Sequence, residues 1–361
     1  MFNQSYKDRK VVVTGHTGFK GSWLSLWLDS LGAKVFGISL PSESELSHWN
    51  LLRLELESQW IDIRDVNLLR TAINRIQPDI IFHLAAQSLV RKSYRDPLDT
   101  WSTNVMGTAN LLDACIGMDN LKGILVVSTD KCYENKEWDW GYREIEPLGS
   151  RDPYGASKAG VELVASSYRD SFFNSQSSAL IATARAGNVI GGGDWSEDRL
   201  IPDIFRSIQK NTPLQVRYPT ATRPWQHVLD CLSGYLLLGE KLLEGKSEFA
   251  EAWNFGPEVT SNRKVSDLLE VVKKSIPDFD WCTITSDEPH ESRLLYLDSS
   301  KAREILNWRP IWSFSESIDM TINWYKDWIH NGKVISLEQL NLYCSQAEIN
   351  KVRQCASRNE F

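Results

Sequence analysis

A short apolar run followed by three evenly spaced glycines near the start of the chain constrains its fold more than any other feature. Residues 11–13 are three valines, which favour a buried strand. Three glycines follow at once, at Gly15, Gly18 and Gly21. Side chains at the first two would obstruct a tight turn and the approach of backbone N–H groups to phosphate, and the third glycine lets a helix pack on the strand. The pattern predicts a strand, a phosphate-binding turn and a helix from 22 to 31, as in dinucleotide-binding domains.

Strand-like and helix-like stretches alternate through the first half of the chain, which predicts βαβ units and a parallel sheet. The expected strands are residues 34–40, 60–63, 80–86 and 123–127, and the expected helices are 66–76, 97–115 and one that starts at Pro153 after its cap Asp152. We therefore expect an α/β protein with a doubly wound (Rossmann) parallel sheet and a smaller, discontinuous α/β substrate domain.

The regular alternation loosens after residue 185, where glycines, prolines and scattered arginines become frequent. We expect a nucleotide-binding domain over 1–185 with a returning segment at about 226–256. We expect the substrate-binding domain over 186–225 and 257–330. The tail, 331–361, is polar with short helical patches, and the sequence assigns it no role.

Composition excludes several classes of function. The 361 residues carry a net charge of −7, which argues against a nucleic-acid partner. The sequence shows no apolar run of about 18 residues and no apolar signal core, so we expect a cytoplasmic protein without a membrane segment. Its six cysteines never form a Cys-x-x-Cys pair, which indicates neither a metal site nor a disulfide framework.

A tyrosine and a lysine one helical turn apart are the first candidate catalytic groups. Tyr154 and Lys158 are expected on one face of the helix that starts at Pro153. A lysine near a cationic nicotinamide stabilises phenolate, so Tyr154 can remove or return a hydroxyl proton while hydride moves. Thr129 follows the strand 123–127 at the carboxyl edge of the sheet, where ligands bind, and can hydrogen-bond the same substrate hydroxyl.

The end of the second predicted strand bears on the choice between NAD and NADP. A carboxylate there favours NAD, and a basic residue favours the phosphate of NADP. Ser39 and Leu40 offer neither, so the sequence favours NAD and predicts weaker retention of it than usual. His16 and His83 are expected to be packing residues, and Lys20 stays open between a contact to phosphate and a solvated position.

The order of motifs from residue 10 to about residue 325 resembles the extended branch of the short-chain dehydrogenase/reductase superfamily, and within it the nucleotide-sugar 4,6-dehydratases. The matching pieces are the glycine loop, Asp62-Ile63, His83-Leu84-Ala85-Ala86-Gln87-Ser88, Thr103-Asn104-Val105-Met106-Gly107-Thr108, Thr129-Asp130, the Tyr154/Lys158 pair, Arg185-Ala186-Gly187-Asn188, Arg199-Leu200-Ile201-Pro202, Arg223-Pro224-Trp225, and Arg293 ahead of Leu297-Asp298. The resemblance implies bound NAD, a nucleotide-sugar substrate, and a homodimer or homotetramer that pairs the helices near 97–115 and 153–173.

The resemblance also implies which residues hold the ligands. The cofactor-binding set is Gly15, Gly18, Phe19, Gly21, Asp62, Ile63, Ala85, Ala86, Gln87, Asn104, Ser128, Tyr154 and Lys158, with Asp62 and Ile63 at the adenine. The substrate-binding set is Ser88, Asn188, Arg199, Arg217, Arg223 and Arg293. Arginine forks match the oxygens of a diphosphate.

Asp130 distinguishes the dehydratases from the epimerases of this superfamily, which carry small residues after the threonine. The implied reaction begins when Tyr154 takes the C4 hydroxyl proton while hydride leaves C4 for NAD, which makes the C5 hydrogen acidic. A base removes that hydrogen as protonated Asp130 donates to the departing C6 hydroxyl, and hydride then returns to C6. The result is a redox-neutral elimination of water.

Lys131 departs from the commonest dehydratase pattern, in which a glutamate follows the aspartate. Thr-Asp-Lys, with the motifs at 191–195 and 223–228, most resembles the dehydratases that act on CDP-glucose, an entry step toward dideoxy sugars of bacterial O-antigen lipopolysaccharide. We hypothesise that Lys131 is the C5 base, since a nearby Lys158 cation would depress its pKa. The alternative is that Lys131 stays charged and stabilises the enolate, with Glu134 or another carboxylate as base.

Two rival functions stay open from the sequence alone. One is a nucleotide-sugar 4-epimerase, or a 4,6-dehydratase for another nucleotide sugar, on the same scaffold. Asp130 argues against the epimerase. The other is a non-catalytic redox or metabolite sensor that only binds the cofactor, and the presence of Thr129, Tyr154 and Lys158 argues against it.

Overall fold

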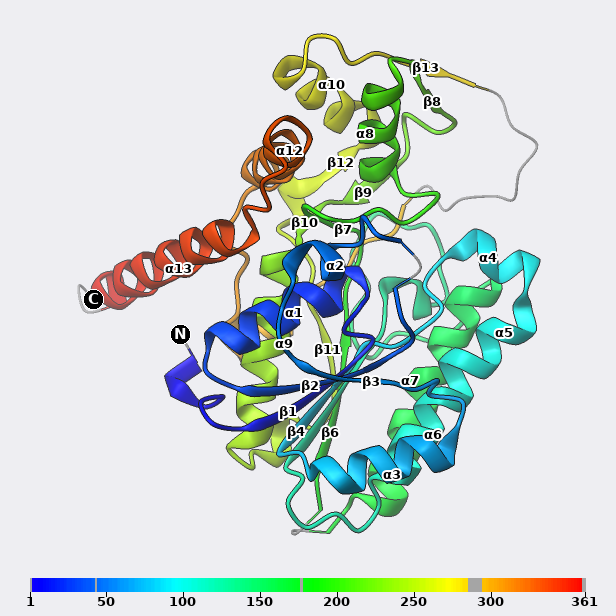
Figure 1. The fold of residues 1–361 in the computed structure, drawn as a ribbon, viewed down its shortest axis with the longest axis vertical. Coiled ribbons are helices and arrows are strands. Elements are labelled where there is room, and N and C mark those ends of the chain that lie inside the picture. Colours follow the sequence, from blue (N-terminus) through cyan, green and yellow to red (C-terminus); the bar gives the residue numbers. More distant parts are fainter. Residues whose placement is uncertain (1, 43, 176–177, 285–293, 359–361) are drawn as a thin grey trace.

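The centre of the molecule is a seven-stranded, all-parallel sheet (Figure 1). The computed structural model describes residues 2–42, 44–175, 178–284 and 294–358. The sheet order is β11-β6-β5-β4-β1-β2-β3. Its strands are β1 (Lys10–Thr14), β2 (Lys34–Ser39), β3 (Glu57–Trp60), β4 (Ile80–His83), β5 (Gly123–Val127), β6 (Leu180–Arg185) and β11 (Ala252–Asn254). The chain reverses its direction of travel across the sheet between β1 and β4, as in doubly wound folds, so the predicted fold class is confirmed.

Helices cover both faces of the sheet because both faces of its strands are apolar. The covering helices are α1 (Phe19–Ser30), α3 (Val66–Ile76), α6 (Gly107–Ala114), α7 (Pro153–Phe172) and α9 (Val228–Leu243). Val11 and Val13 of β1 point into the core that contains residues of α1 and α9. Val12 points to the opposite core, with residues of α3, α6 and α7. The alternation along one short strand therefore fixes which helices share a face.

Several predicted boundaries differ from the structure. Helix α1 begins at Phe19 rather than at Ser22, because the glycine turn leads directly into it. Strand β4 ends at His83, and the residues after it bend to form a wall of the cavity described below. The strand expected at 60–63 is β3, which ends where that stretch begins.

The long helix expected at 97–115 is interrupted. It consists of α5 (Pro97–Trp101), a π-helical turn (Ser102–Met106) and α6. A π-helical turn of this kind is typical of functional regions. Here it contains Asn104, whose side chain turns inward to the segment after β4.

A smaller part lies beyond the carboxyl ends of the sheet strands (Figure 1). Its elements are β7 (Val189–Ile190), α8 (Leu200–Lys210), β8 (Leu214–Val216), β9 (Thr222–Pro224), β10 (Gln226–His227), β12 (Asn262–Lys264), α10 (Val265–Ser275), β13 (Trp281–Thr283) and α12 (Phe314–Asn331). Helix α11 (Ser300–Glu304) packs against β11 of the main sheet. Two short helices, α2 (His48–Leu52) and α4 (Val90–Arg95), follow β2 and β4. The strands of this part form two-stranded pairs, and α9 and β11 return to the main sheet. The division into two domains stays a prediction.

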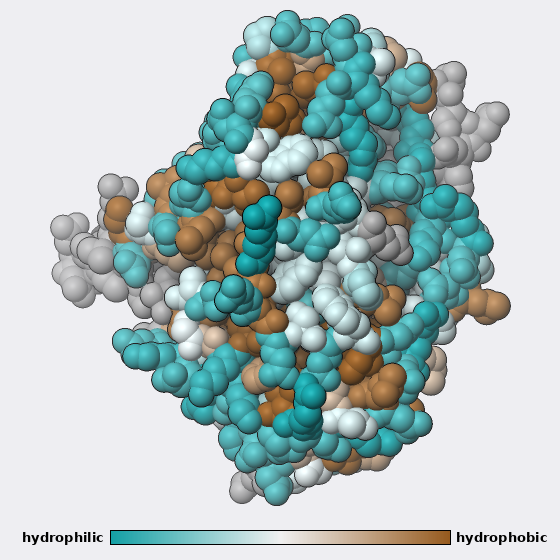
Figure 2. All heavy atoms as spheres, viewed as in Figure 1, coloured by the Kyte–Doolittle hydropathy of each residue, from teal (hydrophilic) through white to brown (hydrophobic). Residues whose placement is uncertain are grey.

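The tail is one long helix, α13 (Ser336–Arg358), so the expectation of short helical patches was wrong. Leu340, Tyr343 and Ala347 are buried at helical spacing. The Tyr343 ring lies 5.5 Å from that of Trp27 on α1, and its hydroxyl donates to Asp230 on α9 at 2.8 Å. Figure 2 shows apolar side chains gathered where α13 leaves the body. These partners lie over a hundred residues away, so the local pattern could not show them.

None of the helices in the described ranges combines the length and the apolar character that crossing a bilayer requires.

Candidate active site

A large cavity of about 1410 Å³ lies at the carboxyl ends of the strands around the point where the strand order reverses. The glycine loop and the segments after β2, β4 and β5 line one side, and residues of α8, β8 and β9 line the other. All of the site residues expected from the sequence line this cavity, apart from Asn104 and from Arg293, which lies outside the described residues. The fold therefore gathers predicted positions from most of the chain into one site.

The glycine loop has the shape of a phosphate cradle. Gly15 has φ +72°, and a Cβ there would lie 2.7 Å from the backbone nitrogen of Ala85. A Cβ at Gly21 would lie 2.1 Å from the Gly15 carbonyl oxygen. Gly18 caps α1 without a side-chain hydrogen bond, so the first N–H groups of that helix are left for an anion. The loop fits a dinucleotide pyrophosphate.

The end of the cavity assigned to adenosine contains Asp62, held by a neighbouring arginine. Arg64 donates to both carboxylate oxygens of Asp62, with Nε at 3.0 Å from each. These hydrogen bonds hold the pKa of Asp62 below its usual value. At the end of β2 the Ser39 hydroxyl lies 2.8 Å from that of Thr17, and neither Ser39 nor Leu40, the described residues at this strand end, carries a carboxylate for a ribose.

Asn104 lies behind the cavity wall rather than on it. Its Oδ1 accepts from the Gln87 backbone nitrogen at 2.8 Å, and its Nδ2 donates to the Gln87 carbonyl at 3.0 Å and to Ser157 at 2.8 Å. The amide thus fixes the segment after β4 to α7. We infer that Asn104 shapes the cofactor wall through Gln87 instead of contacting the cofactor.

Tyr154 and Lys158 enter the cavity from the first turns of α7. Asp152 caps this helix by accepting from the Gly155 nitrogen at 2.9 Å. Burial lowers the pKa of Lys158 to about 8, with the charge of Lys20 acting in the same direction, and Lys158 donates to the Val127 carbonyl at 2.9 Å.

The protein alone does not lower the pKa of Tyr154, contrary to what the tyrosine–lysine pair suggests. Burial raises it to about 12, although the Thr129 hydroxyl and the charge of Arg199 oppose that rise. A proton-accepting Tyr154 therefore needs positive charge close to its hydroxyl, from the Lys158 ammonium and from the bound ligand.

Asp130 is buried at the start of a 3₁₀ turn that follows β5, with 3 % of its surface exposed. It accepts from the Thr129 hydroxyl at 3.0 Å. Burial raises its pKa, although the charges of Lys131, Arg223 and Lys20 oppose that rise. A carboxyl group with a raised pKa suits a proton donor.

The structure locates two residues, Lys20 and Glu134, whose roles the sequence left undecided. Lys20 donates to the Tyr235 hydroxyl at 3.3 Å, and its charge acts on Lys158 and Asp130, so it lies at the end of the cavity that holds these two residues. Glu134 is half-exposed, pairs with Lys136, and is not among the residues that line the cavity. This position disfavours Glu134 as the C5 base.

The arginines on the substrate side occupy different parts of the cavity. Arg199 donates to Asp194 at 3.0 Å and to Ser88 at 3.3 Å, and its charge acts on Tyr154. Arg223 donates to the Thr222 carbonyl at 2.8 Å and lies near Asp130. Arg217 and Asn188 also line the cavity.

Sequence reasoning missed a link across the cavity. Arg91 of α4 pairs at 2.6 Å with Asp198 in the loop before α8. This ion pair joins the side of the cavity formed by the sheet segments to the smaller part of the molecule. Neither residue stands in a motif, so no local signal marked it.

Comparison with known proteins places this site in a family. The model of the GDP-mannose 4,6 dehydratase family matches residues 12–321. The chain is 45% identical over 360 residues to CDP-glucose 4,6-dehydratase of Salmonella typhimurium, covering 98% of each protein. The chain belongs to the nucleotide-sugar 4,6-dehydratases.

Solved structures agree with this assignment. A dTDP-glucose 4,6-dehydratase of Streptomyces venezuelae, solved with NAD and TYD, is 26% identical with a TM-score of 0.75, over 88% of this chain and 97% of that one. A UDP-glucuronic acid 4-epimerase of Bacillus cereus, solved with UDP-glucuronic acid and NAD, is 25% identical with a TM-score of 0.76, over 88% and 99%. Dehydratases and epimerases thus share this scaffold, so side chains within the cavity must separate them.

Proposed function

We propose that this protein is an NAD-dependent CDP-glucose 4,6-dehydratase, a hydro-lyase that converts CDP-glucose to CDP-4-keto-6-deoxyglucose and water. The observation that carries the proposal is the buried acid Asp130, in one cavity with Thr129, Tyr154 and Lys158. The choice of CDP rests on the 45% identity to the Salmonella enzyme. The product would serve the synthesis of deoxy and dideoxy sugars of bacterial O-antigen.

The residues around the glycine loop fit NAD. Gly15, Gly18 and Gly21 leave room for the pyrophosphate, and Asp62 and Ile63 line the adenosine end. When bound, NAD would supply the hydride acceptor for C4 of the sugar and the hydride donor for C6. Because Ser39 and Leu40 at the end of β2 offer the ribose no carboxylate, we expect NAD to dissociate more readily than usual in this fold, so assays should contain added NAD.

The side chains of the cavity supply the proton steps. Tyr154 accepts the C4 hydroxyl proton, with Thr129 holding the same hydroxyl and Lys158 stabilising the phenolate. The resulting 4-ketone acidifies the C5 hydrogen, which Lys131 removes. Asp130 then gives its proton to the C6 oxygen, the C6–O bond breaks, and water leaves. Return of hydride to C6 and of a proton to C5 completes a redox-neutral reaction.

Product mass tests the proposal most directly. The protein is incubated in heavy water with added NAD and, separately, CDP-, UDP-, GDP- or dTDP-glucose. Loss of one water and gain of one solvent deuterium with the CDP sugar alone is the expected result. An unchanged mass with inverted C4 would make the protein an epimerase, and no turnover of any sugar would favour a cofactor-binding sensor.

Lys131→Met should slow exchange of the C5 proton of supplied CDP-4-keto-6-deoxyglucose by about 10²–10⁴-fold, the usual range for a lost general base. Exchange into heavy water, followed by NMR, measures this step without C4 oxidation. Lys136→Met is the matched control, since Lys136 pairs with Glu134 outside the cavity. Exchange at the wild-type rate in Lys131→Met would exclude Lys131 as the base.

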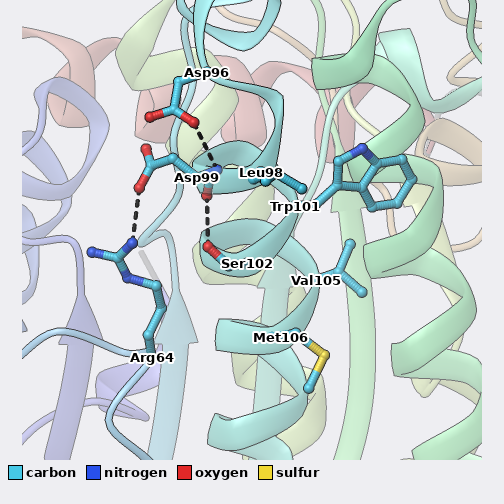
Figure 3. A pocket seen from close by; sticks show the side chains of 8 residues that line it. All are labelled: Arg64, Asp96, Leu98, Asp99, Trp101, Ser102, Val105 and Met106. Carbon is cyan, nitrogen blue, oxygen red and sulfur yellow. Dashed lines mark hydrogen bonds and ion pairs between the residues drawn. The ribbon is translucent and has the colours of Figure 1, made fainter.

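An exposed apolar face of the molecule suits a second copy of the chain. Figure 3 shows Leu98, Trp101, Val105 and Met106 around a hollow of about 680 Å³, with Arg64 and Asp99 at one side. Leu98 is 80% exposed and Met106 is 55% exposed, which is unusual for such side chains. In this superfamily the same helices pair between subunits, and we propose a homodimer through this face, alone or within a tetramer.

Leu98→Glu should weaken that dimer by about 30-fold or more, since a charge would be buried at the centre of an apolar contact. Sedimentation velocity across a concentration series measures the dissociation constant. Ile145→Glu is the control, because Ile145 is 89% exposed on a different segment. Unchanged association in Leu98→Glu would rule out this face.

A cytoplasmic location is part of the proposal. The five cysteines described by the structure are all free. Unpaired cysteines are typical of a reducing compartment.

A further inference from the structure

A buried ion pair lies behind the catalytic lysine and takes no part in the steps described above. Glu162 follows Lys158 by one helical turn on α7, and both side chains are buried. Arg185 ends β6 and holds the Glu162 carboxylate with two hydrogen bonds of 2.9 Å, from Nε to Oε1 and from Nη2 to Oε2. Thr183 donates to Oε2 at 2.7 Å. The carboxylate is therefore fixed by three hydrogen bonds from two residues.

Stability alone does not account for this pair. The two side chains are 4% and 3% exposed, so both charges have been taken out of water. Replacing such a pair with apolar residues of similar volume is often neutral or stabilising. Burial alone would raise the pKa of Glu162, but Arg185 and the hydroxyl of Thr183 hold it below its usual value, so the group is a permanent anion.

The neighbours of Lys158 show what this anion does. Residues four apart on a helix lie side by side, so Glu162 is adjacent to Lys158. Three other titratable groups interact electrostatically with Lys158. They are Lys20 from α1, His83 from β4 and Cys132 from the turn after β5. Burial and Lys20 lower the pKa of Lys158, whereas Glu162 raises it. Among these groups Glu162 is the carboxylate.

We propose that Glu162 is a positioning residue of the reaction: its carboxylate, fixed by Arg185 and Thr183, is the negative charge that holds Lys158 as an ammonium ion beside Tyr154. Without it, the charge of Lys20 and the low dielectric of the site would favour a neutral amine. A neutral amine does not stabilise the phenolate of Tyr154. The kinetic part of this inference rests on the proposed function, and the titration of Lys158 does not.

Arg185 extends the same network to the other half of the site. Its Nη1 donates to the Tyr133 hydroxyl at 2.7 Å and to the Glu144 carbonyl at 3.1 Å. Tyr133 stands two residues after Lys131. The pair thus fixes helix α7 relative to the segment that holds Asp130 and Lys131.

Titration of Lys158 in the protein without substrate tests the inference directly. Lysine is labelled with ¹³C at Cε, and the Lys158 signal is identified by its loss in Lys158→Arg. Glu162→Gln should move the titration midpoint of Lys158 down by about one pH unit. Glu240→Gln is the matched control, because Glu240 is a buried carboxylate on α9 that accepts a hydrogen bond from the Ser5 hydroxyl. This variant should leave the titration midpoint of Lys158 unchanged.

The pH profile of turnover gives a second readout. In Glu162→Gln the alkaline limb of kcat should move down with the Lys158 midpoint, so that kcat just above pH 8 falls about tenfold, while KM for CDP-glucose stays nearly constant. A purely structural role would lower the amount of folded protein without moving either curve. Absence of turnover in the wild type would refute the proposed function and leave the titration result standing.

A double variant guards against loss of folding. Glu162→Gln leaves Arg185 buried without its partner, which is costly, whereas Glu162→Gln with Arg185→Met removes both charges. Because Glu162 stands one turn from Lys158 on α7 and acts on its charge, whereas Arg185 reaches the pair from β6, the double variant should still show a lowered midpoint, by less than the single variant. An unchanged Lys158 midpoint in whichever variant folds would overturn the inference.

Discussion

Asp130→Asn should lower dehydration of CDP-glucose by about 10²–10⁴-fold while leaving C4 oxidation intact. The asparagine cannot donate a proton to the departing C6 oxygen, but Tyr154 and Lys158 are unchanged. Reduced cofactor should therefore accumulate on the enzyme in a single turnover. Absorbance of the nicotinamide and quantification of the 4-keto product separate the two steps.

A substrate with a better leaving group sharpens this prediction. CDP-6-deoxy-6-fluoroglucose expels fluoride, which needs less help from an acid than hydroxide does. Asp130→Asn should regain most of its elimination rate with this analogue, whereas a variant with a distorted site should not. Asp230→Asn is the matched control, because Asp230 is equally buried but does not line the cavity. Full dehydration of CDP-glucose by Asp130→Asn would show that Asp130 is not the proton donor.

Tyr154→Phe should lower kcat by a similar factor of about 10²–10⁴, through an earlier step. Without the phenol nothing in the cavity takes the C4 hydroxyl proton, so no reduced cofactor should accumulate. The variant should still exchange the C5 proton of supplied CDP-4-keto-6-deoxyglucose, since that step uses Lys131.

Tyr168→Phe serves as control for Tyr154→Phe, because Tyr168 lies on the same helix away from the cavity. Rapid formation of reduced cofactor by Tyr154→Phe would mean that another group is the C4 base. Loss of both oxidation and C5 exchange would point to a general collapse of the site. The two outcomes are distinguished by the same pair of measurements.

Much of the fold followed from local patterns. Strand β5 and helix α3 have the predicted bounds, and the glycines lie in the predicted turn. Each of these features depends on residues that are neighbours in sequence or repeat with the period of one element. The Tyr154 and Lys158 pair is of the same kind, since one helical turn places both on one face.

Other features depend on contacts that no local pattern contains. Asn104 matches a family motif, yet its amide is used by Gln87 and Ser157, 17 and 53 residues away. Helix α13 owes its position to Trp27 and Asp230. The sequence offered Glu134 as a possible base, and the path of the chain after β5 turns it away from the cavity.

The sequence by itself determined the α/β class, the phosphate-binding turn, the family and the candidate catalytic groups, because each depends on short motifs with fixed spacing. Only the tertiary structure decided the pKa values of these groups. Burial, which raises the pKa of Asp130 and Tyr154 and lowers that of Lys158, is a sum over neighbours from many elements. The Glu162–Arg185 pair became visible for the same reason, since α7 and β6 meet only in the folded chain.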